Sequence, residues 1–270
     1  MALVANLLTG MDSRVNSVSQ GVVGDNLVIE AQSYLRIMGF PIGNFGTNKN
    51  GVDGKLGEAT KASLRAFQIL TENEIEINTV SSTTVNELEE AAKANSTFRS
   101  LSAIADKKGI QLSISNQSSP AEFVNTVYHY SILDEASSKI PAAATTAQAI
   151  LETGYGKSIP QDLETGQYSY NLFGIKGNGP AGSATSWTRE ENPKSKIWET
   201  VRARFRVYHN YLESIKDHSQ FFYDNIKRYG NAFQKSTPVE FVKAIAKAGY
   251  ATDSKYANKI ITIMNYWGLS

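Results

Sequence analysis

The chain has 270 residues, 41% of them hydrophobic and 20% charged, which is typical of a globular protein with one large or two modest domains. Its net charge of +1 argues against a nucleic-acid partner, and no apolar run reaches the ~20 residues of a membrane span, so we expect no membrane insertion. The lack of cysteine excludes thiolate catalysis and cysteine-ligated metals, and the three histidines form no HExxH motif, so we expect no metal and no cofactor.

The first residues are mostly polar and irregular, and we expect a loose N-terminal arm at 1–24. Its short apolar patch has no basic segment before it. A cleavable secretory signal begins with such a basic segment, so we do not expect one here.

Three helices are predicted in the first third of the chain from apolar residues at helical spacing. They are Leu27–Gly39, Glu58–Leu70 and Thr84–Ala94. Gly39 suits the left-handed cap that ends a helix, and Thr84 with Glu87 three residues later predicts a capping box. Residues 40–57, rich in glycine and asparagine, predict a structured loop.

Short motifs accompany these helices. They are Ala31-Gln32, Leu35, Met38-Gly39-Phe40, Gly51-Val52-Asp53-Gly54-Lys55-Leu56-Gly57, Thr60 and Ala66-Phe67-Gln68. This order resembles the peptidoglycan-binding domain type 1 family, a small three-helix bundle. The resemblance implies that residues 25–94 bind peptidoglycan, with the loop 40–57 as the contact surface. Leu35 and Phe67 are expected in the core, and Asp53 can bond its own backbone; a purely structural bundle is the alternative.

Residues 95–118 show little periodicity, and we interpret them as a linker with a short helical patch at Phe98–Asp106. A second domain, 119–270, is expected to begin at Ser119-Pro120-Ala121-Glu122. This sequence combines a serine N-cap, a proline at the first helical position and a glutamate at the third, which together favour a helix start.

The Ala-rich run Ala142–Leu151 predicts a helix that ends at Gly154. Glu152 then lies in the last turn, where unpaired carbonyls and the helix dipole disfavour a carboxylate. Partial burial beside Ile150 and Tyr155 would raise its pKa further. A carboxyl that stays protonated near neutral pH suits general acid catalysis, although an isolated glutamate on a helix is usually an ordinary surface residue.

A β-hairpin is predicted after the Gly- and Tyr-rich stretch 167–182. Ser183–Arg189 can form one strand, and Glu199–Tyr208 alternates apolar residues with arginines as a half-exposed strand does. Hydrolysis of a glycoside by two carboxylates needs a second one across the cleft, and Glu190 is in the right region. Glu191 is adjacent, and strand alternation allows only one of them to face the cleft.

Three helices are predicted to close the chain, at Asn210–Asn225, from Thr237 to Gly249, and at Ser254–Trp267 with Asp253 as its cap. The predicted fold is therefore mainly α: a helical domain with one small β-hairpin lobe, preceded by a small three-helix bundle.

The second half also carries five motifs in order. They are Gln148-Ala149…Leu151-Glu152-Thr153-Gly154-Tyr155-Gly156, Tyr170-Asn171-Leu172-Phe173-Gly174-Ile175-Lys176, Thr188-x-Glu190, Phe205-Arg206-Val207-Tyr208…Tyr211-Leu212-Glu213-Ser214 and Ala248-Gly249-Tyr250-Ala251-Thr252-Asp253…Tyr256-Ala257. Together they resemble the glycoside hydrolase family 73 glucosaminidases, including the flagellar rod-assembly hydrolases, over residues 120–267. The resemblance implies a lysozyme-like fold and a peptidoglycan substrate cut at the β-1,4 bond after N-acetylglucosamine. The family's proline after Asp253 is Ser254 here.

The resemblance also implies the roles of individual residues. Glu152 is the implied catalytic acid, and Glu190, in the family's T-x-E position, is the implied second carboxylate. Tyr250 and Tyr256 fall in a segment where a tyrosine near the acid is implied in catalysis. The implied substrate-binding residues are Tyr170, Asn171, Phe173 and Trp187. Core packing is the alternative role for Phe173, and hairpin packing for Trp187 and Trp198.

Two mechanisms are compatible with these residues. Glu190 could act as a base on water, which gives inversion, or the substrate's N-acetyl carbonyl could attack while Glu190 steadies it, which gives retention. A muramidase, a lytic transglycosylase and a non-catalytic wall-binding protein are alternative functions. The arrangement of a binding domain before a catalytic domain resembles a phage endolysin, with a bacterial autolysin or a tail-associated lysin as alternatives. We expect a monomer that waits in the host cytoplasm until it reaches peptidoglycan.

Overall fold

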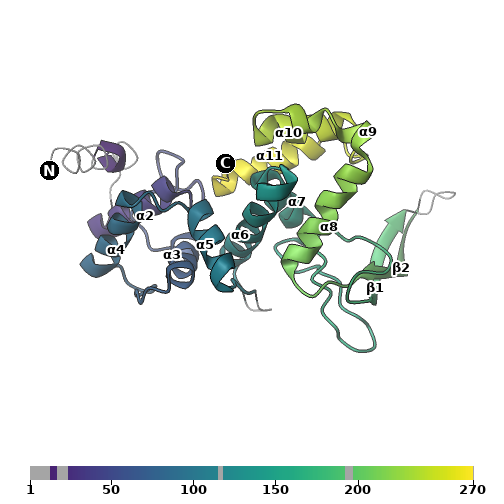
Figure 1. The fold of residues 1–270 in the computed structure, drawn as a ribbon, viewed down its shortest axis with the longest axis horizontal. Helices are drawn as coiled ribbons and strands as arrows, with labels where there is room; N and C mark the ends of the chain where they lie inside the picture. Colours follow the sequence, from purple (N-terminus) through teal and green to yellow (C-terminus); the bar gives the residue numbers. More distant parts are fainter. Residues whose placement is uncertain (1–12, 17–23, 115–117, 192–196, 270) are drawn as a thin grey trace. The chain divides into compact units, whose positions relative to one another are not determined.

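The computed structural model describes residues 13–16, 24–114, 118–191 and 197–269 (Figure 1). Most of the expected N-terminal arm, 1–24, lies outside these ranges. Within the described residues, no helix is both long enough and apolar enough to cross a lipid bilayer.

The chain divides into two compact units, which we call the first and the second unit. The first comprises Met1–Leu133 with Asn258–Ser270, and the second comprises Asp134–Ala257. The division thus falls inside helix α6 (Pro120–Ser138), whereas the sequence suggested a boundary before residue 119.

The first turns of α6 pack with the preceding helices, which is why they belong to the first compact unit. The Asn125 amide nitrogen lies 3.4 Å from the Ser63 hydroxyl, and the Tyr128 ring stacks on Phe98 with ring centroids 5.5 Å apart. Leu112 is also buried, and its carbonyl accepts a hydrogen bond from a tyrosine of α6. These contacts join residues distant in sequence, whereas the predicted start at residue 119 rested on a local helix-start signal.

The first unit contains the three predicted helices. They are α2 (Asn26–Met38), α3 (Glu58–Thr71) and α4 (Ser82–Lys93). Helix α2 begins at an Asp25 cap and ends at Gly39, whose φ of 86° is the left-handed conformation that glycine adopts without strain. Leu35 and Phe67 are fully buried, as expected of core residues.

The start of α4 differs from the prediction. The N-cap is Ser81, whose hydroxyl accepts from the Thr84 N–H at 3.2 Å, so Thr84 itself is inside the helix. The predicted capping box does not form, because Glu87 instead accepts a hydrogen bond from Asn73. Four successive hydroxyl residues precede the apolar run, and any of them is an acceptable cap on sequence grounds.

The loop between α2 and α3 is held by one buried amide. Gln32 is 1% exposed, and its oxygen accepts from the N–H groups of Asp53 and Gly54 at 2.9 Å each. Its nitrogen donates to Asp53, to the Lys55 carbonyl and to the Thr60 hydroxyl. Asp53 also accepts from the Lys55 N–H, which confirms the predicted local bond. The glycine-rich loop is therefore fixed in place rather than open.

The predicted linker contains a packed helix, α5 (Phe98–Lys108). Its residues Phe98, Leu101 and Ala105 are buried. They follow the i, i+3, i+7 spacing of a helix face, and the intervening Arg99, Ser100 and Ser102 make this spacing hard to see in the sequence. Residues 98–108 are thus part of the first unit's core.

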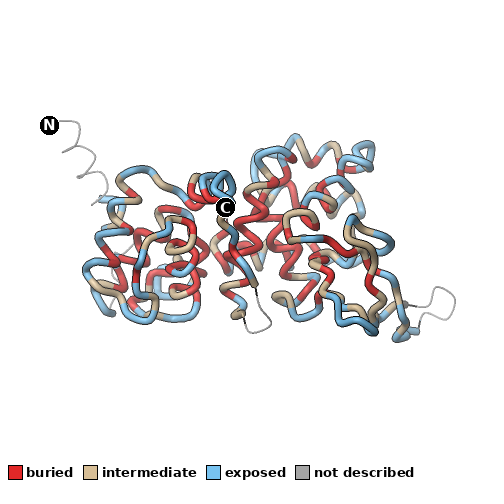
Figure 2. Tube along the Cα trace, turned by 60° about the horizontal axis from the view of Figure 1, so that its bottom comes forward, coloured by how far each residue is buried: buried red, intermediate tan, exposed pale blue. Residues whose placement is uncertain are grey.

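Over its described residues, the second unit is mainly helical with one two-stranded antiparallel sheet, which confirms the predicted fold class. Its elements after α6 are α7 (Ala142–Thr153), β1 (Ser183–Glu191), β2 (Trp198–Arg206), α8 (Tyr211–Asp224), α9 (Ile226–Tyr229), the short 3-10 helix η1 (Ala232–Gln234), α10 (Pro238–Lys247) and the first two residues of α11 (Tyr256–Trp267). Buried positions gather on the helices and are sparse on the hairpin (Figure 2). Helices α9 and η1 were not predicted.

Most predicted helix starts of this half are confirmed. Ser119 and Glu122 each accept from the other's backbone N–H, at 3.2 and 2.8 Å, and Thr237 and Glu240 form the same capping box. Asn210 accepts from the first turn of α8. Helix α11 begins later than predicted, because the Asp253 side chain caps a turn two residues long instead of the helix.

Candidate active site

Helix α7 is a buried helix with one exposed residue near its end. All its residues except Leu151 and Glu152 are buried, and Glu152 is exposed. The helix ends as predicted at Gly154, which has φ 56° and ψ 50° and donates to the Ile150 carbonyl at 2.9 Å. A carboxyl is therefore held at the end of a rigid, packed element.

Glu152 lies on a cleft of about 990 Å³ in the second unit. Although the residue has a large accessible surface, the protein around its carboxyl displaces enough water to raise the pKa of Glu152 above its ordinary value of 4.5. The predicted direction of this pKa is thus confirmed, and its main physical cause is desolvation. The raised pKa favours the protonated carboxyl that a general acid needs.

Two tyrosines, Tyr250 and Tyr256, interact electrostatically with Glu152. Burial is the main cause that raises the pKa of Tyr250 and of Tyr256, and the Glu152 charge raises both further. Their rings are 5.4 Å apart between centroids. The Tyr256 hydroxyl accepts from the Gln148 amide nitrogen at 2.7 Å, one turn before Glu152 on α7. The structure thus gathers both predicted tyrosines around the acid, although neither lines the cleft.

The β-hairpin supplies the second carboxylate of the cleft. The register pairs Glu190 with Glu199 and Ala184 with Phe205, so these four residues share one face of the hairpin. Ala184 and Phe205 are buried, which makes this the inward face. Glu190 lines the cleft together with Glu152. The side chain of Glu191 lies outside the described residues.

Glu190 is paired with a lysine of the cleft. The Lys176 ammonium donates to the Glu190 Oε1, and both side chains are about half exposed, at 53% and 40%. A surface ion pair of this kind stabilises the fold by only about 0.2–1 kcal/mol. Its main consequence here is to orient the Glu190 carboxylate.

A third carboxylate in the cleft, Asp162, is used to hold structure. Its oxygens accept from the backbone N–H groups of Glu164, Thr165 and Thr185 and from a threonine hydroxyl, at 2.8–3.1 Å. These hydrogen bonds lower the pKa of Asp162 to about 2. Asp162 is thus ionised at neutral pH and cannot act as the acid, and it fastens its loop to β1.

The segment Asn171–Lys176 forms one part of the cleft wall. The Asn171 side chain is fully buried, donates to the carbonyls of Ile175 and Arg206 at 2.8 and 3.0 Å, and accepts from the Ile175 N–H at 3.0 Å. Asn171 therefore shapes the wall from within. Phe173 also lines the cleft and stacks on His218 with ring centroids 3.8 Å apart.

Two further predicted contact residues, Tyr170 and Trp187, differ in their position relative to the cleft. The Tyr170 ring packs edge to face with Tyr168 and Tyr211, and Tyr170 does not line the cleft. Trp187 does line the cleft but belongs to the hairpin face opposite Glu190. Its ring is 54% exposed and carries the Arg202 guanidinium at 5.0 Å from the ring centroid.

Sequence reasoning missed three residues of this site: Lys176, Asp162 and His218. Lys176 was visible as the last residue of a resemblance motif, without a stated partner. Asp162 carried only a weak local signal. An Asp side chain in a turn commonly accepts a hydrogen bond from the backbone N–H two residues later, which is called an Asx turn. His218 falls inside the predicted helix Asn210–Asn225, where no motif singled it out.

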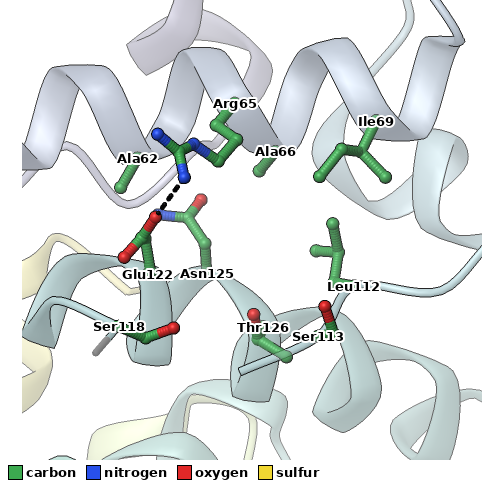
Figure 3. A pocket seen from close by; sticks show the side chains of 10 residues that line it. All are labelled: Ala62, Arg65, Ala66, Ile69, Leu112, Ser113, Ser118, Glu122, Asn125 and Thr126. Carbon is green, nitrogen blue, oxygen red and sulfur yellow. Dashed lines mark ion pairs between the residues drawn. The ribbon is translucent and has the colours of Figure 1, made fainter. Parts of the chain in front are cut away.

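A cavity of about 420 Å³ in the first unit offers a different chemistry (Figure 3). It lies between α3 and the start of α6, and its one carboxylate, Glu122, is paired with Arg65 at 2.8 Å. None of the predicted catalytic residues lines it. Among the described residues, no group of three or more His, Asp or Glu side chains is arranged to hold a metal ion. The cleft with Glu152 is therefore the candidate active site.

Comparison with known proteins places this cleft in a family. The sequence profile named Glucosaminidase, described as mannosyl-glycoprotein endo-beta-N-acetylglucosaminidase, matches residues 130–269. The chain is 36% identical over 148 residues to the peptidoglycan hydrolase FlgJ of Vibrio parahaemolyticus, covering 54% of this chain and 46% of that protein. It is 38% identical over 146 residues to the exo-glucosaminidase LytG of Bacillus subtilis, covering 52% and 49%.

Among solved structures, the catalytic domain of the autolysin Auto from Listeria monocytogenes is 26% identical, with a TM-score of 0.48, and the match covers 61% of this chain and 92% of that one. The chain spans about half the length of the curated relatives it matches. Because the family profile extends over more than half of the chain and includes every residue of the cleft, the chain belongs to the glucosaminidase family of glycoside hydrolases.

Proposed function

We propose that this chain is a peptidoglycan hydrolase that cuts the β-1,4 bond after N-acetylglucosamine within the glycan strand and so lyses the cell wall. The observation that carries the proposal is the pairing of two carboxylates in one cleft, Glu152 with its raised pKa and Glu190 on the hairpin. The names of the relatives, a peptidoglycan hydrolase and an exo-glucosaminidase, support the same substrate class.

In the proposed reaction Glu152 gives its proton to the glycosidic oxygen as the bond breaks. Glu190 then removes a proton from the water that attacks the sugar, which inverts the configuration. If the N-acetyl carbonyl of the substrate attacks first, Glu190 instead steadies that group and the product retains its configuration. The anomer released in the first minutes of hydrolysis, read by NMR, distinguishes these two routes.

The test is the chemistry of the ends made from purified peptidoglycan, read by mass spectrometry. We expect new reducing N-acetylglucosamine ends with the wild-type chain and none with Glu152→Gln. Reducing N-acetylmuramic acid ends would identify a muramidase, and anhydromuramyl ends a lytic transglycosylase. A chain that binds the wall and makes no ends would be a binding protein, and each of these three outcomes would overturn the proposal.

We propose further that residues 25–94 hold the wall through the loop 40–57. The support is the resemblance of its motifs, together with the rigid loop that Gln32 fixes. Phe45, 40% exposed on that loop, offers an aromatic surface of the kind on which sugar rings stack. In an inactive Glu152→Gln background, Phe45→Ala should weaken co-sedimentation with purified sacculi. Ile104→Ala, another exposed apolar residue of the first unit but outside the loop, is the matched control and should not.

The setting we propose is that of a phage endolysin which acts when the membrane is opened. The support is the resemblance of the two-part architecture. Cells that express the chain should keep their turbidity until the inner membrane is permeabilised and should then lyse, while lysis without permeabilisation would contradict this setting.

A further inference from the structure

A buried histidine connects the wall of the cleft to a tyrosine beside the acid. His218, on α8, is 2% exposed, and its Nε2 lies 3.0 Å from the Tyr250 hydroxyl oxygen. One face of its ring is covered by Phe173, which lines the cleft, in a stack with an interplanar angle of 10°. Phe222 meets the ring edge to face at 5.1 Å. The position of the imidazole is thus fixed by packing.

The burial of His218 keeps it neutral. Loss of water lowers the pKa of His218 to about 3, so the ring carries one proton, on either Nε2 or Nδ1, at any pH near neutrality. The Nδ1 atom is buried and has no hydrogen-bond partner among the residues that the structure describes. A buried N–H without an acceptor is rarer in proteins than an acceptor without a donor. The proton is therefore expected on Nε2, where the Tyr250 oxygen receives it.

This tautomer determines the direction of the Tyr250 hydroxyl. If Nε2 donates to the tyrosine oxygen, the hydroxyl's own hydrogen must point away from His218. Tyr250 keeps that hydrogen, because burial holds its pKa well above the ordinary value. Tyr250 packs against Tyr256 with ring centroids 5.4 Å apart, and the Tyr256 hydroxyl accepts from Gln148, one turn before Glu152 on α7. These contacts place Tyr250 near the face of α7 that carries Glu152, whose charge raises the Tyr250 pKa further.

We infer that His218 is a positioning residue, which donates from Nε2 to Tyr250 and so leaves the Tyr250 hydroxyl free to donate to Glu152. The inference rests on the proposed function, because the benefit appears as Glu152 loses its proton to the glycosidic oxygen. The neutral acid needs no such donor, whereas the carboxylate that forms in the transition state does. A hydrogen bond that strengthens as negative charge develops on Glu152 stabilises the transition state more than the ground state, and so lowers the activation barrier.

Two amide variants separate the two ring nitrogens. Glutamine places its amide nitrogen near the position of Nε2, whereas the shorter asparagine reaches only the position of Nδ1. We expect His218→Gln to keep kcat within about threefold of wild type, and His218→Asn to lower kcat by about tenfold with little change in KM. Equal kcat values for the two variants, at comparable thermal stability, would overturn the inference.

A double-variant cycle tests whether His218 acts through the tyrosine. Tyr250→Phe, which removes the hydroxyl, should also lower kcat by about tenfold. Adding His218→Asn to Tyr250→Phe should then cost nothing more, because the hydrogen bond it breaks is already gone. If the second change lowers kcat by its full factor again, His218 does not act through Tyr250.

The tautomer itself can be read in the wild-type chain without any activity measurement. With only three histidines in the chain, ¹⁵N-histidine labelling gives three imidazole patterns, and the one lost in His218→Gln belongs to His218. We expect a protonated Nε2 and an unprotonated Nδ1 at pH 7. The reverse pattern would overturn the inference whatever the enzyme does. Absence of reducing N-acetylglucosamine ends would instead overturn the proposed function and leave the tautomer result standing.

Discussion

The two sides of the cleft carry their carboxylates in opposite ways. On the helical side, Glu152 projects from a helix that is otherwise buried, among tyrosines that are themselves buried. On the hairpin side, Glu190 stands on an exposed two-stranded ribbon and is paired with Lys176. Desolvation therefore sets the protonation of the Glu152 carboxyl. The ion pair with Lys176 orients the Glu190 carboxylate, which remains accessible to water.

This difference matches what the two groups must do. A general acid must hold its proton until the bond breaks, and desolvation provides that by disfavouring the carboxylate. A group that activates or stabilises an incoming molecule from solvent needs access to water and a fixed direction instead. The buried side and the exposed side are thus suited to separate halves of one reaction.

The largest effect should come from the helical side. Glu152→Gln keeps the size and the buried setting of the side chain but has no proton to give. We expect kcat to fall by at least about 10³-fold on purified peptidoglycan, within the range that general acid–base groups contribute. Binding to sacculi and the circular dichroism spectrum should stay unchanged. Lysis at the wild-type rate would remove Glu152 from the mechanism.

On the hairpin side, Glu190→Gln should lower kcat by about 10²-fold, less than the loss at Glu152. The neighbouring Glu191→Gln is the matched control, because it changes the same charge one residue further along the strand. We expect its kcat within about twofold of wild type. An equal or larger loss at Glu191 would reassign the second carboxylate.

A smaller effect is expected from Asp162→Asn, because Asp162 connects its loop to β1 of the hairpin. Asp162→Asn replaces one accepting oxygen with a donor and so breaks hydrogen bonds to β1 or to its own loop. We expect a lower Tm and a kcat reduced by less than about tenfold, since Asp162 positions the hairpin and does not touch the reaction. Glu164→Gln, the exposed carboxylate two residues on, should change neither. A loss as large as that of Glu190→Gln would make Asp162 a catalytic group.

Comparison of the two sides also shows which features a sequence can predict. The Glu152 helix was predictable because Ala-rich propensity and a Gly154 cap are local signals, and the hairpin because alternation is local as well. The partners of the carboxylates were not predictable from local pattern. Lys176 precedes Glu190 by 14 residues, and only the folded loop brings them together.

The surroundings of the acid were equally hidden in the sequence. The His218 contact with Tyr250 joins residues 32 apart, and the Gln148 contact with Tyr256 joins residues 108 apart. The sequence placed His218 inside the predicted helix Asn210–Asn225, but a helical pattern cannot distinguish a packed imidazole from one that holds a tyrosine. The resemblance motifs supplied both tyrosines, and the structure supplies what they contact.

The smallest expected effect is on the thermal stability of the Glu152→Gln variant, and it depends on pH. Because burial raises the pKa of Glu152 above 4.5, the folded chain holds that proton more tightly than the unfolded chain does. The stability this contributes is fully present below pH 4.5 and is lost as pH rises through the folded pKa. Glu152→Gln cannot ionise, so its Tm should match wild type at pH 4 and exceed it at pH 8, by about 2 °C or less because the side chain is partly exposed. Scanning calorimetry at the two pH values measures the difference, and a variant less stable than wild type at pH 8 would mean that the ionised Glu152 has a stabilising partner.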